Sequence, residues 1–342
     1  GDASTEVLEP LAASRREIER WRNHFADLDA AAEQLADDMR LSRGDIGIAL
    51  IERLRERHQL SVRFLPQEIM PDSLRRLDLH ARQVQLSEML SNASRNFQLA
   101  LQIAQLEFAD AIEAIAKGSK FDDEAARALF IRHLTGYVAA ALLMPYSRFL
   151  RACEATGYDL PILERRFGVS FEQLAHRLTT LQRIGQRGLP FFMVRIDRAG
   201  QFSKTFTGAS TARFIESGSS CPLWDAHRAF DRAGELQVQF VALDNAGDRD
   251  GGWLTMARTV EGSGAPGKAQ FVIVLGVEAV FAQELAQARG VPLRSDDAQP
   301  IGPGCARCHR SRCSQRSLPP IGRKLAFDKV RTGITPFEFA PD

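Results

Sequence analysis

The sequence predicts an α+β protein in which a mostly helical domain, residues 1–187, precedes a smaller α+β domain, residues 188–342, that carries a site of four cysteines. Three observations support this prediction. Apolar residues recur at steps of three and four through much of the first half, which is the spacing of amphipathic helices. After Gly188-Leu189-Pro190, short apolar runs punctuated by glycine are typical of strands. Four of the five cysteines follow this change.

The first elements are expected to be helices and then short strands. Helices are predicted over residues 14–57, interrupted at Arg43-Gly44-Asp45, because apolar side chains recur there every three or four residues. Polar and apolar residues then alternate, which predicts strands at residues 60–65 and between residues 77 and 86.

The middle of the chain is expected to be helical. A long helix over residues 88–117 should end at Gly118, and Phe121-Asp122-Asp123 should cap the next helix, which Pro145 stops. Further helices are expected at residues 146–156, 161–167 and 171–184.

The second domain should consist mainly of strands. A buried strand is expected at residues 191–196, and strands punctuated by glycine are expected at residues 236–243, 253–260 and 271–275. One helix, over residues 280–289, should precede the cysteine loop.

Composition and charge exclude several classes of protein. The 342 residues carry 44 basic and 43 acidic side chains, so a net charge of +1 gives no overall attraction to nucleic acid. No apolar run reaches the ~18 residues that a membrane-spanning helix requires, so no membrane partner is expected. The start, Gly1-Asp2-Ala3, lacks methionine and a secretory signal, which favours a tag remnant or a truncation. Reduced, clustered cysteines fit the cytoplasm.

Four cysteines form the strongest candidate for a functional site. Cys305, Cys308 and Cys313 lie in one loop rich in glycine, and Cys221 lies upstream in Cys221-Pro222-Leu223-Trp224. Tetrahedral thiolate sites need four sulfurs, so the pattern predicts a bound metal, either structural zinc or an iron–sulfur cluster. A disulfide between Cys305 and Cys308 would be too tight, which argues against paired cysteines.

The residues around these cysteines fit either kind of metal. A [4Fe-4S] cluster with four thiolates carries a net charge of about 2−, and nearby cations and amide donors would stabilise it. The cations are supplied by Arg307, Arg310, Arg312 and Arg316. Zinc would accept the same ligands, with His309 as an alternative to one cysteine. The favoured interpretation of His309 is a solvated side chain or a hydrogen-bond donor to a metal ligand. However, zinc sites usually contain two Cys-x-x-Cys pairs, and this chain has one.

The helix expected around residues 96–106 resembles the active-site helix of the IrrE/ImmA-type metallopeptidases, whose pattern is Phe-x-Leu-Ala-His-Glu-x-Gly-His-Leu. The resemblance implies a zincin-like fold for the first domain. The places of the two histidines and the catalytic glutamate carry Leu101, Gln102 and Gln105, and the place of the carboxylate ligand carries Leu134. These side chains cannot replace zinc ligands, so we expect a degenerate domain without peptidase activity. The alternative is an ordinary amphipathic core helix.

A second resemblance covers most of residues 10–325. The run from Gly188 to Lys204, the Cys221-Pro222-Leu223-Trp224 motif, Ala257-Arg258-Thr259-Val260 and the loop from Pro300 resemble the short-chain fatty acyl transcriptional regulators. The resemblance implies a dimeric regulator that senses a short-chain acyl-CoA and contacts DNA through an Xre-type helix-turn-helix, which this chain lacks. In the mycobacterial branch it also implies a [4Fe-4S] cluster, and we therefore favour the cluster over zinc.

An acyl-CoA effector brings phosphates and a small apolar thioester tail. Cations beside an apolar slot should bind it, and we expect this site between the two domains. The candidates are Arg177, which is the first choice, Arg195, Arg198, Lys204, Arg40 and Tyr137. The simpler alternatives are a salt-bridged arginine and a buried tyrosine. Trp224 is expected to shield the metal from water or to stack on adenine, and Cys153 is expected to be an ordinary buried thiol.

The sequence thus favours the effector-sensing portion of a cytoplasmic transcriptional regulator. Acyl-CoA would bind one arrangement of the two domains more tightly than another. Its binding would so alter the spacing of two DNA-binding heads in a dimer. The alternatives are a divergent zinc-containing hydrolase and a structural zinc interaction scaffold. Four cysteines would fill every position around zinc and leave none for a substrate, which argues against the hydrolase.

Overall fold

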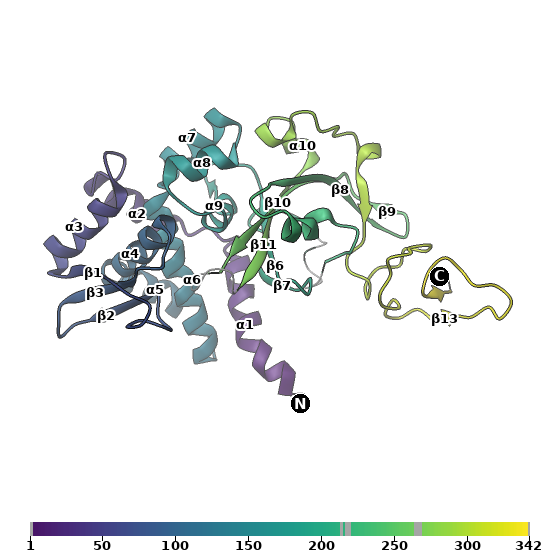
Figure 1. Cartoon of the computed structure of the whole chain (residues 1–342), viewed down its shortest axis with the longest axis horizontal. Helices are drawn as coiled ribbons and strands as arrows, with labels where there is room; N and C mark the ends of the chain where they lie inside the picture. Colours follow the sequence, from purple (N-terminus) through teal and green to yellow (C-terminus); the bar gives the residue numbers. More distant parts are fainter. Residues whose placement is uncertain (1–2, 213–214, 216–219, 263–268, 341–342) are drawn as a thin grey trace. The chain divides into compact units, whose positions relative to one another are not determined.

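The computed structural model describes residues 3–212, 215, 220–262 and 269–340. The chain forms two compact units, of which the first contains Gly1–Gly188 and the second contains Leu189–Val260 and Gln270–Asp342. The first unit is mostly helical and the second is mostly strands, so the protein is of the mixed α+β class (Figure 1). The domain boundary expected before residue 188 lies next to the division at Gly188.

Helix α6 is the central helix of the first unit. It contacts α1, α2, α4, α5 and α9, because a helix that is apolar on all sides becomes buried in a core. The helices are α1 Ala3–Arg20, α2 Ala26–Asp38, α3 Ile46–His58, α4 Asn92–Glu107, α5 Ala109–Gly118, α6 Glu124–Leu143, α7 Tyr146–Thr156, α8 Leu160–Phe167 and α9 Phe171–Leu178 (Figure 1). Within the described residues, no single helix has the length and composition to cross a membrane, although α6 and α7, bent by 64°, meet that test as a pair.

The predicted limits of α6 are confirmed. The side chain of Asp123 accepts a hydrogen bond from the backbone N–H of Ala125 and so caps the first turn, and Pro145 follows the last turn. Helices α7 and α8 also occupy their predicted ranges to within a residue. Helix α9 starts with a capping box, in which Ser170 and Gln173 each accept a hydrogen bond from the other's backbone N–H.

Two long helical predictions are wrong in their continuity. The helix over residues 14–57 is interrupted a second time, between α1 and α2, where Arg22 and Asn23 have φ angles of 52° and 51°. An α-helix cannot contain such left-handed residues. The helix over residues 88–117 is divided at Phe108 into α4 and α5.

The helix predicted over residues 171–184 is too long. Helix α9 ends at Leu178, and the chain then forms a hairpin of β4 Gln182–Arg183 and β5 Gln186–Arg187. The hydroxyl of Tyr146 joins both strands, because it donates to a backbone oxygen of β5 at 2.6 Å and accepts from a backbone N–H of β4 at 2.9 Å.

A three-stranded sheet in the order β1-β3-β2 lies within the described part of the first unit. The strands predicted at residues 60–65 and 77–86 are confirmed as β1 Ser61–Leu65, β2 Arg75–Asp78 and β3 Gln83–Ser87. Strand β3 pairs with β1 in parallel and with β2 in antiparallel, and its central position explains why most of its side chains are buried.

The second unit is built on a sheet whose described strands follow the order β12-β8-β10-β11-β6-β7, with β9 paired to β8. The strands are β6 Phe192–Ile196, β7 Phe202–Phe206, β8 Gln237–Asn245, β9 Asp248–Arg249, β10 Trp253–Glu261, β11 Gln270–Glu278 and β12 Gln299–Ile301 (Figure 1). The predicted strands are β6, β8, β10 and β11, whereas β7, β9 and β12 were not predicted. Strand β12 is parallel to β8 and leads directly into the cysteine loop.

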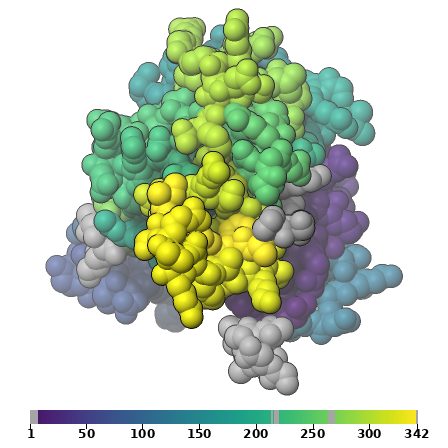
Figure 2. Space-filling view, turned by 90° about the vertical axis from the view of Figure 1, so that its right-hand side faces the viewer, coloured from purple at the N-terminus to yellow at the C-terminus, as the bar shows by residue number. Residues whose placement is uncertain are grey.

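The helix predicted over residues 280–289 is mostly wrong. Only Ala279–Ala282 forms an α-helical turn, α10, and a separate 3₁₀ turn, η2, follows at Ala286–Ala288. The backbone N–H of Leu285 bonds to the oxygen three residues back, which is the tighter 3₁₀ pattern. The remaining short elements are η1 Asp225–Asp231, η3 Ser295–Asp297, β13 Leu325–Ala326 and β14 Glu338–Phe339. The C-terminal segment that carries β13 and β14 lies at the surface (yellow in Figure 2).

The apolar core of the second unit extends to the cysteines. Cys221 and Trp224 are buried in one cluster with residues of β6, β8, β10 and β11, and Ile301 at the end of β12 belongs to the same cluster. The indole N–H of Trp224 donates to the hydroxyl of Thr255 at 3.2 Å. Two chain segments, one at Cys221 and one just before the cysteine loop, are therefore held by a single core.

Candidate functional site

The structure brings the four predicted metal ligands around one small hollow. Cys221, Cys305, Cys308 and Cys313 line a cavity of about 10 Å³, and all four are free thiols. Cys221 and Cys308 are buried, while the other two are half-buried. Cys221 comes from the segment before η1, and the other three come from the loop after β12.

The sulfur atoms do not form a closed metal-binding geometry. Among the residues that the structure describes, no three side chains of His, Cys, Asp or Glu are placed to hold a metal ion. The lining of the hollow contains the four thiols and the side chains of Arg310, Gln315 and Arg316, without a carboxylate from the described residues. A donor set of thiols alone suits zinc or an iron–sulfur centre and not calcium or magnesium, so the residues fit the predicted class of metal.

Backbone N–H groups point at three of the sulfurs. Gly302 and Leu223 donate to Cys221, Arg310 donates to Cys308, and Ser317 donates to Cys305 at 3.5 Å. Such amide donors stabilise a thiolate, whether it is free or bound to a metal.

Burial and hydrogen bonding act in opposite directions on these thiols. Burial raises the pKa of Cys221 and of Cys308, against the hydrogen bonds that they accept. Burial also acts to raise the pKa of Cys305, but hydrogen bonds from Ser317 and the nearby charge of Arg316 outweigh it, so that this pKa is lowered.

Arg316 holds the cysteine loop in shape. The sequence indicated it only as a nearby cation, but its side chain is buried, at 4% exposure. The guanidinium donates to the backbone oxygens of Cys305 at 2.9 Å, Cys308 at 2.6 Å, Arg310 at 3.0 Å and Leu318 at 3.1 Å. One planar group with several N–H donors can join that many carbonyls, so Arg316 positions the residues on both sides of the hollow.

Gly302 provides the space that Cys308 needs. A Cβ atom at residue 302 would lie 2.7 Å from the Sγ of Cys308, which is closer than real Cβ contacts. The backbone N–H of Gly302 also donates to Cys221. This glycine therefore allows the chain to pass between two of the thiols.

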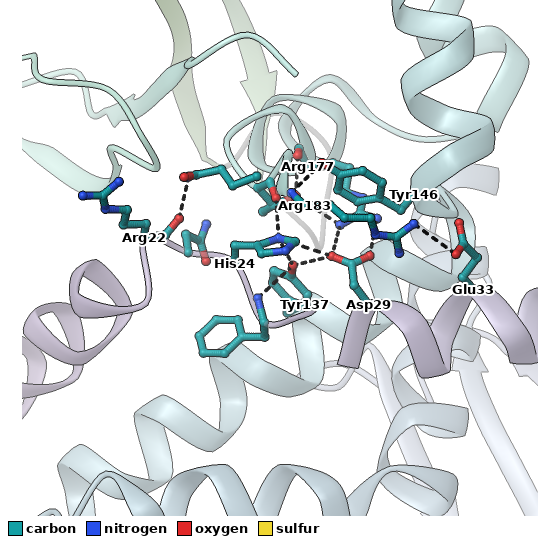
Figure 3. A network of polar contacts seen from close by, with 12 residues as sticks. Arg22, His24, Asp29, Glu33, Tyr137, Tyr146, Arg177 and Arg183 are labelled. Atoms are coloured by element: carbon teal, nitrogen blue, oxygen red, sulfur yellow. Dashed lines mark hydrogen bonds and ion pairs between the residues drawn. The ribbon is translucent and has the colours of Figure 1, made fainter. Parts of the chain in front are cut away.

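Arg177, the first choice for an effector cation, is buried inside the first unit. Its exposure is 1%, and its guanidinium binds both carboxylate oxygens of Asp29, at 2.7 and 3.2 Å (Figure 3). It also donates to the backbone oxygen of Met144 at 3.1 Å and to the hydroxyl of Thr180 at 3.0 Å. The prediction that Arg177 binds phosphates is therefore corrected: its guanidinium is buried, out of reach of a ligand, and already paired with Asp29.

Tyr137 belongs to the same buried network. Its hydroxyl donates to Asp29 at 2.5 Å and accepts a hydrogen bond from the backbone N–H of Phe25 at 3.2 Å (Figure 3). Burial raises the pKa of Tyr137, and the charge of Asp29 raises it further. Tyr137 is thus a core tyrosine with a satisfied hydroxyl, which is the alternative that the sequence left open.

The other candidate cations lie near the surface. Arg195 on β6 faces Lys204 on β7 in register, and its guanidinium donates to Ser203 at 2.8 Å and stacks on Phe271 at 4.3 Å. Arg198 is exposed and donates to Gln270 at 2.8 Å. Arg40, also exposed, follows α2 in a left-handed conformation with φ of 55°. None of these residues lines the hollow of the four cysteines.

Three further residues have defined surroundings. Trp224 packs in the core, where its indole N–H is bonded to Thr255, so the prediction that it could stack on adenine is wrong. The backbone N–H of His309 donates to the side chain of Asn245 at 2.6 Å, and its ring lies 3.3 Å from a nitrogen of Arg323. Cys153 is buried on α7, and burial raises its pKa, as expected of an ordinary core thiol.

On α4, the helix that resembles the peptidase active-site helix, the guanidinium of Arg75 lies beside two positions at which the peptidases carry zinc-binding or catalytic residues. Arg75 on β2 donates to the side-chain oxygens of Gln98 at 3.1 Å, Gln102 at 2.5 Å and Gln105 at 3.2 Å. Burial lowers the pKa of Arg75. Leu101 lies on the same helix, α4, and Leu134 is fully buried on α6. No pattern in the sequence pointed to Arg75, because only the tertiary fold brings this residue of β2 to the glutamines of α4.

Two protein-family models match the chain. The model described as short-chain fatty acyl coenzyme A regulator, C-terminal, matches residues 180–337. The model described as IrrE N-terminal-like domain matches residues 55–179. The two matches adjoin near the division between the two units.

Individual relatives match almost the whole chain. The HTH-type transcriptional regulator RamB of Mycobacterium tuberculosis is 38% identical, and the match covers 98% of this chain and 71% of the relative. The HTH-type transcriptional regulator PrpR of the same species is 35% identical, with 92% of this chain and 64% of the relative covered. A propionyl-CoA carboxylase regulator of Cereibacter sphaeroides is 36% identical, with 92% and 66% covered. A solved structure of a Mycobacterium tuberculosis transcriptional regulator has a TM-score of 0.87 and 34% identity, and the match covers 96% of this chain and 99% of that chain.

The fold and these relatives define the class of protein, which is that of transcriptional regulators. Within this class, the chain belongs to the family of short-chain fatty acyl coenzyme A regulators. The resemblance predicted from the motifs around Cys221 and Cys305 is therefore confirmed.

Proposed function

We propose that this chain is the effector-sensing portion of a cytoplasmic transcriptional regulator, that it binds a short-chain acyl-CoA, and that its four cysteines hold a [4Fe-4S] cluster. The observation that carries the proposal is the hollow lined by four free thiols from two distant segments. The description of the matched family model supports an acyl-CoA effector.

Cys221, Cys305, Cys308 and Cys313 would be the ligands of the cluster. Bound there, the cluster would cross-link the segment before η1 to the loop after β12 and could respond to oxidants. The amide donors to the sulfurs and the cations of Arg310 and Arg316 in the lining would offset a net charge of about 2− on the cluster. One observation favours a second candidate, a structural zinc scaffold: a hollow of about 10 Å³ needs less rearrangement to take a single ion.

Metal analysis tests the choice between these candidates. After anaerobic purification, a cluster gives about four iron and four sulfide per chain and absorbance near ~400 nm, whereas zinc gives one colourless ion per chain. Cys313→Ser should lower the metal content, and Cys153→Ser, a buried thiol outside the hollow, is the matched control. One zinc per chain would contradict the cluster, and a metal-free wild-type protein would contradict both candidates.

Thermal melting tests the effector. A ligand at about one hundred times its Kd stabilises a protein by about 2.7 kcal/mol, so saturating propionyl-CoA should raise the melting temperature measurably. Identical melting curves with propionyl-CoA, acetyl-CoA, CoA and buffer would contradict an acyl-CoA effector.

The proposed regulator acts as a dimer that contacts DNA through a helix-turn-helix. Effector binding would favour one arrangement of the dimer and so change its affinity for DNA, as linkage requires. Analytical ultracentrifugation with and without propionyl-CoA would measure whether the chain forms the dimer by itself.

A further inference from the structure

Two adjoining cavities on the first unit form a groove that no predicted residue had indicated. One cavity is about 440 Å³ and the other about 480 Å³, and they share Leu41, Ser42, Arg148 and Arg151. Each volume lies within the range of about 300–1,000 Å³ that is typical of small-molecule sites. We name it the arginine groove, after Arg148, Arg151 and Arg166 in its lining.

Helix α7 forms one wall of the groove with a single stripe of residues. Arg148, Arg151, Ala152 and Ala155 all line it, and the spacings of three and four residues place them on one face of the helix. The two arginines supply charge, and the two alanines leave the wall open. The opposite wall comes from the end of α2 and the turn that leads to α3.

The two ends of the groove differ in character. The first cavity is lined largely by polar and charged side chains, among them Glu33, Asp37 and Ser147. The second is lined by Ile46, Phe167 and other apolar residues, together with arginines. A ligand that fits both ends would carry a charged part and an apolar part.

The arginines of the groove are not neutralised by the acids beside them. Glu33 accepts a hydrogen bond from the backbone N–H of Ser147 at 2.8 Å and is paired with Arg183 at 3.2 Å, so it is already satisfied. Asp37 attracts Arg148, whose guanidinium is half-buried over the ring of Phe167 at 5.2 Å. Glu33 and Asp37 therefore leave the two other arginines of the groove uncompensated.

Arg151 and Arg166 carry the uncompensated charge. Over the described part of the chain, neither side chain has a hydrogen bond or an ion pair with an acid. Two guanidiniums without partners, next to a third that is held by stacking on Phe167, suit a ligand with several negatively charged oxygens, and phosphate groups are such ligands.

We propose that the arginine groove binds a phosphate-bearing ligand with an apolar part, with Arg151 and Arg166 on its phosphates, and that the acyl-CoA of the proposed function is this ligand. The identity of the ligand rests on the proposed function, whereas the phosphate chemistry rests on the groove. The effector site then lies in the first unit on exposed arginines, and the buried Arg177 has a structural role.

Isothermal titration of the full chain tests this inference. The probes are propionyl-CoA, adenosine 3′,5′-bisphosphate, which lacks the acyl part, and propionate, which lacks phosphate. The double variant Arg151→Ala/Arg166→Ala should bind propionyl-CoA and the bisphosphate at least about tenfold more weakly, since two charge-assisted contacts are lost. Arg165→Ala, an exposed arginine adjacent to Arg166 that does not line the groove, is the control and should bind as the wild type does.

A second variant fills the cavity itself. Ala155 is exposed and lines the second cavity together with Arg151 and Arg166, so Ala155→Phe should weaken the binding of both propionyl-CoA and the bisphosphate. Wild-type affinity of the double arginine variant for propionyl-CoA would overturn the groove and leave the proposed function standing. A third outcome is that the wild type binds the bisphosphate but not propionyl-CoA, and that the double arginine variant binds the bisphosphate more weakly. That outcome would keep the groove as a phosphate site and reject the acyl-CoA effector. Binding of neither would overturn both.

Discussion

Replacing Arg177 with methionine should destabilise the first unit more than almost any other single change. Methionine keeps most of the bulk but leaves the carboxylate of Asp29, fully buried at 0% exposure, without its positive partner. Removal of one member of a buried ion pair costs about 3–5 kcal/mol. At about 2–4 °C per kcal/mol for a unit of roughly 150–250 residues, the melting temperature of the first unit should fall by about 6–20 °C.

Urea denaturation and thermal melting would measure this effect. The double variant Asp29→Leu/Arg177→Met removes both charges and should recover much of the loss, because an apolar pair needs no partner. Arg165→Met changes an exposed arginine and should alter stability by less than about 0.5 kcal/mol. A loss below about 1 kcal/mol for Arg177→Met, together with the loss of propionyl-CoA binding, would refute the reasoning, since Arg177 would then be a ligand contact.

Three further changes have defined outcomes. Gly302→Ala should reduce the bound metal measured per chain, because the new Cβ would lie 2.7 Å from Sγ of Cys308, whereas Gly118→Ala meets open space and should not. Burial lowers the pKa of His24 below its ordinary 6.5. The unfolded chain therefore binds more protons than the folded chain, and the urea midpoint should decline as the pH falls below about 6.5. His24→Gln should flatten that decline. Arg75→Met should cost about 1–3 kcal/mol in urea unfolding, since three glutamine oxygens lose their donor; an unchanged midpoint would mean that Arg75 does not hold α4 to β2.

Local patterns predicted the elements whose causes are local. Helix α6 was predicted correctly because Asp123 and Pro145 mark its ends, and β1 and β3 were predicted because their residues alternate. The end of α9 at Leu178 is followed by a hairpin whose two strands are both bonded to the hydroxyl of Tyr146, a residue distant in the sequence. No local pattern marks this end or the break at Phe108.

The two candidate sites also differ in how far the sequence could predict them. Three of the four cysteines are close in sequence, so their grouping was predictable, and only the position of Cys221 needed the fold. Arg177 and Asp29 are 148 residues apart, so the partner that removes Arg177 from the effector site was invisible in the sequence. One signal did exist: Asp29 lies among the buried residues Leu28 and Ala32 of α2, where an acid needs a buried cation.

The placement of Cys221 connects the proposed metal to the stability of the sheet. Cys221 belongs to the same buried cluster as Trp224 and Val274, while its sulfur lines the hollow with the three cysteines of the loop. Arg316 and Gly302 fix that loop from the other side. A metal held by all four thiols would therefore join the loop to the core of the sheet, and its loss would free the loop first while the cluster around Trp224 stays packed. Metal content should thus control the order of the cysteine loop more strongly than the global melting temperature of the second unit.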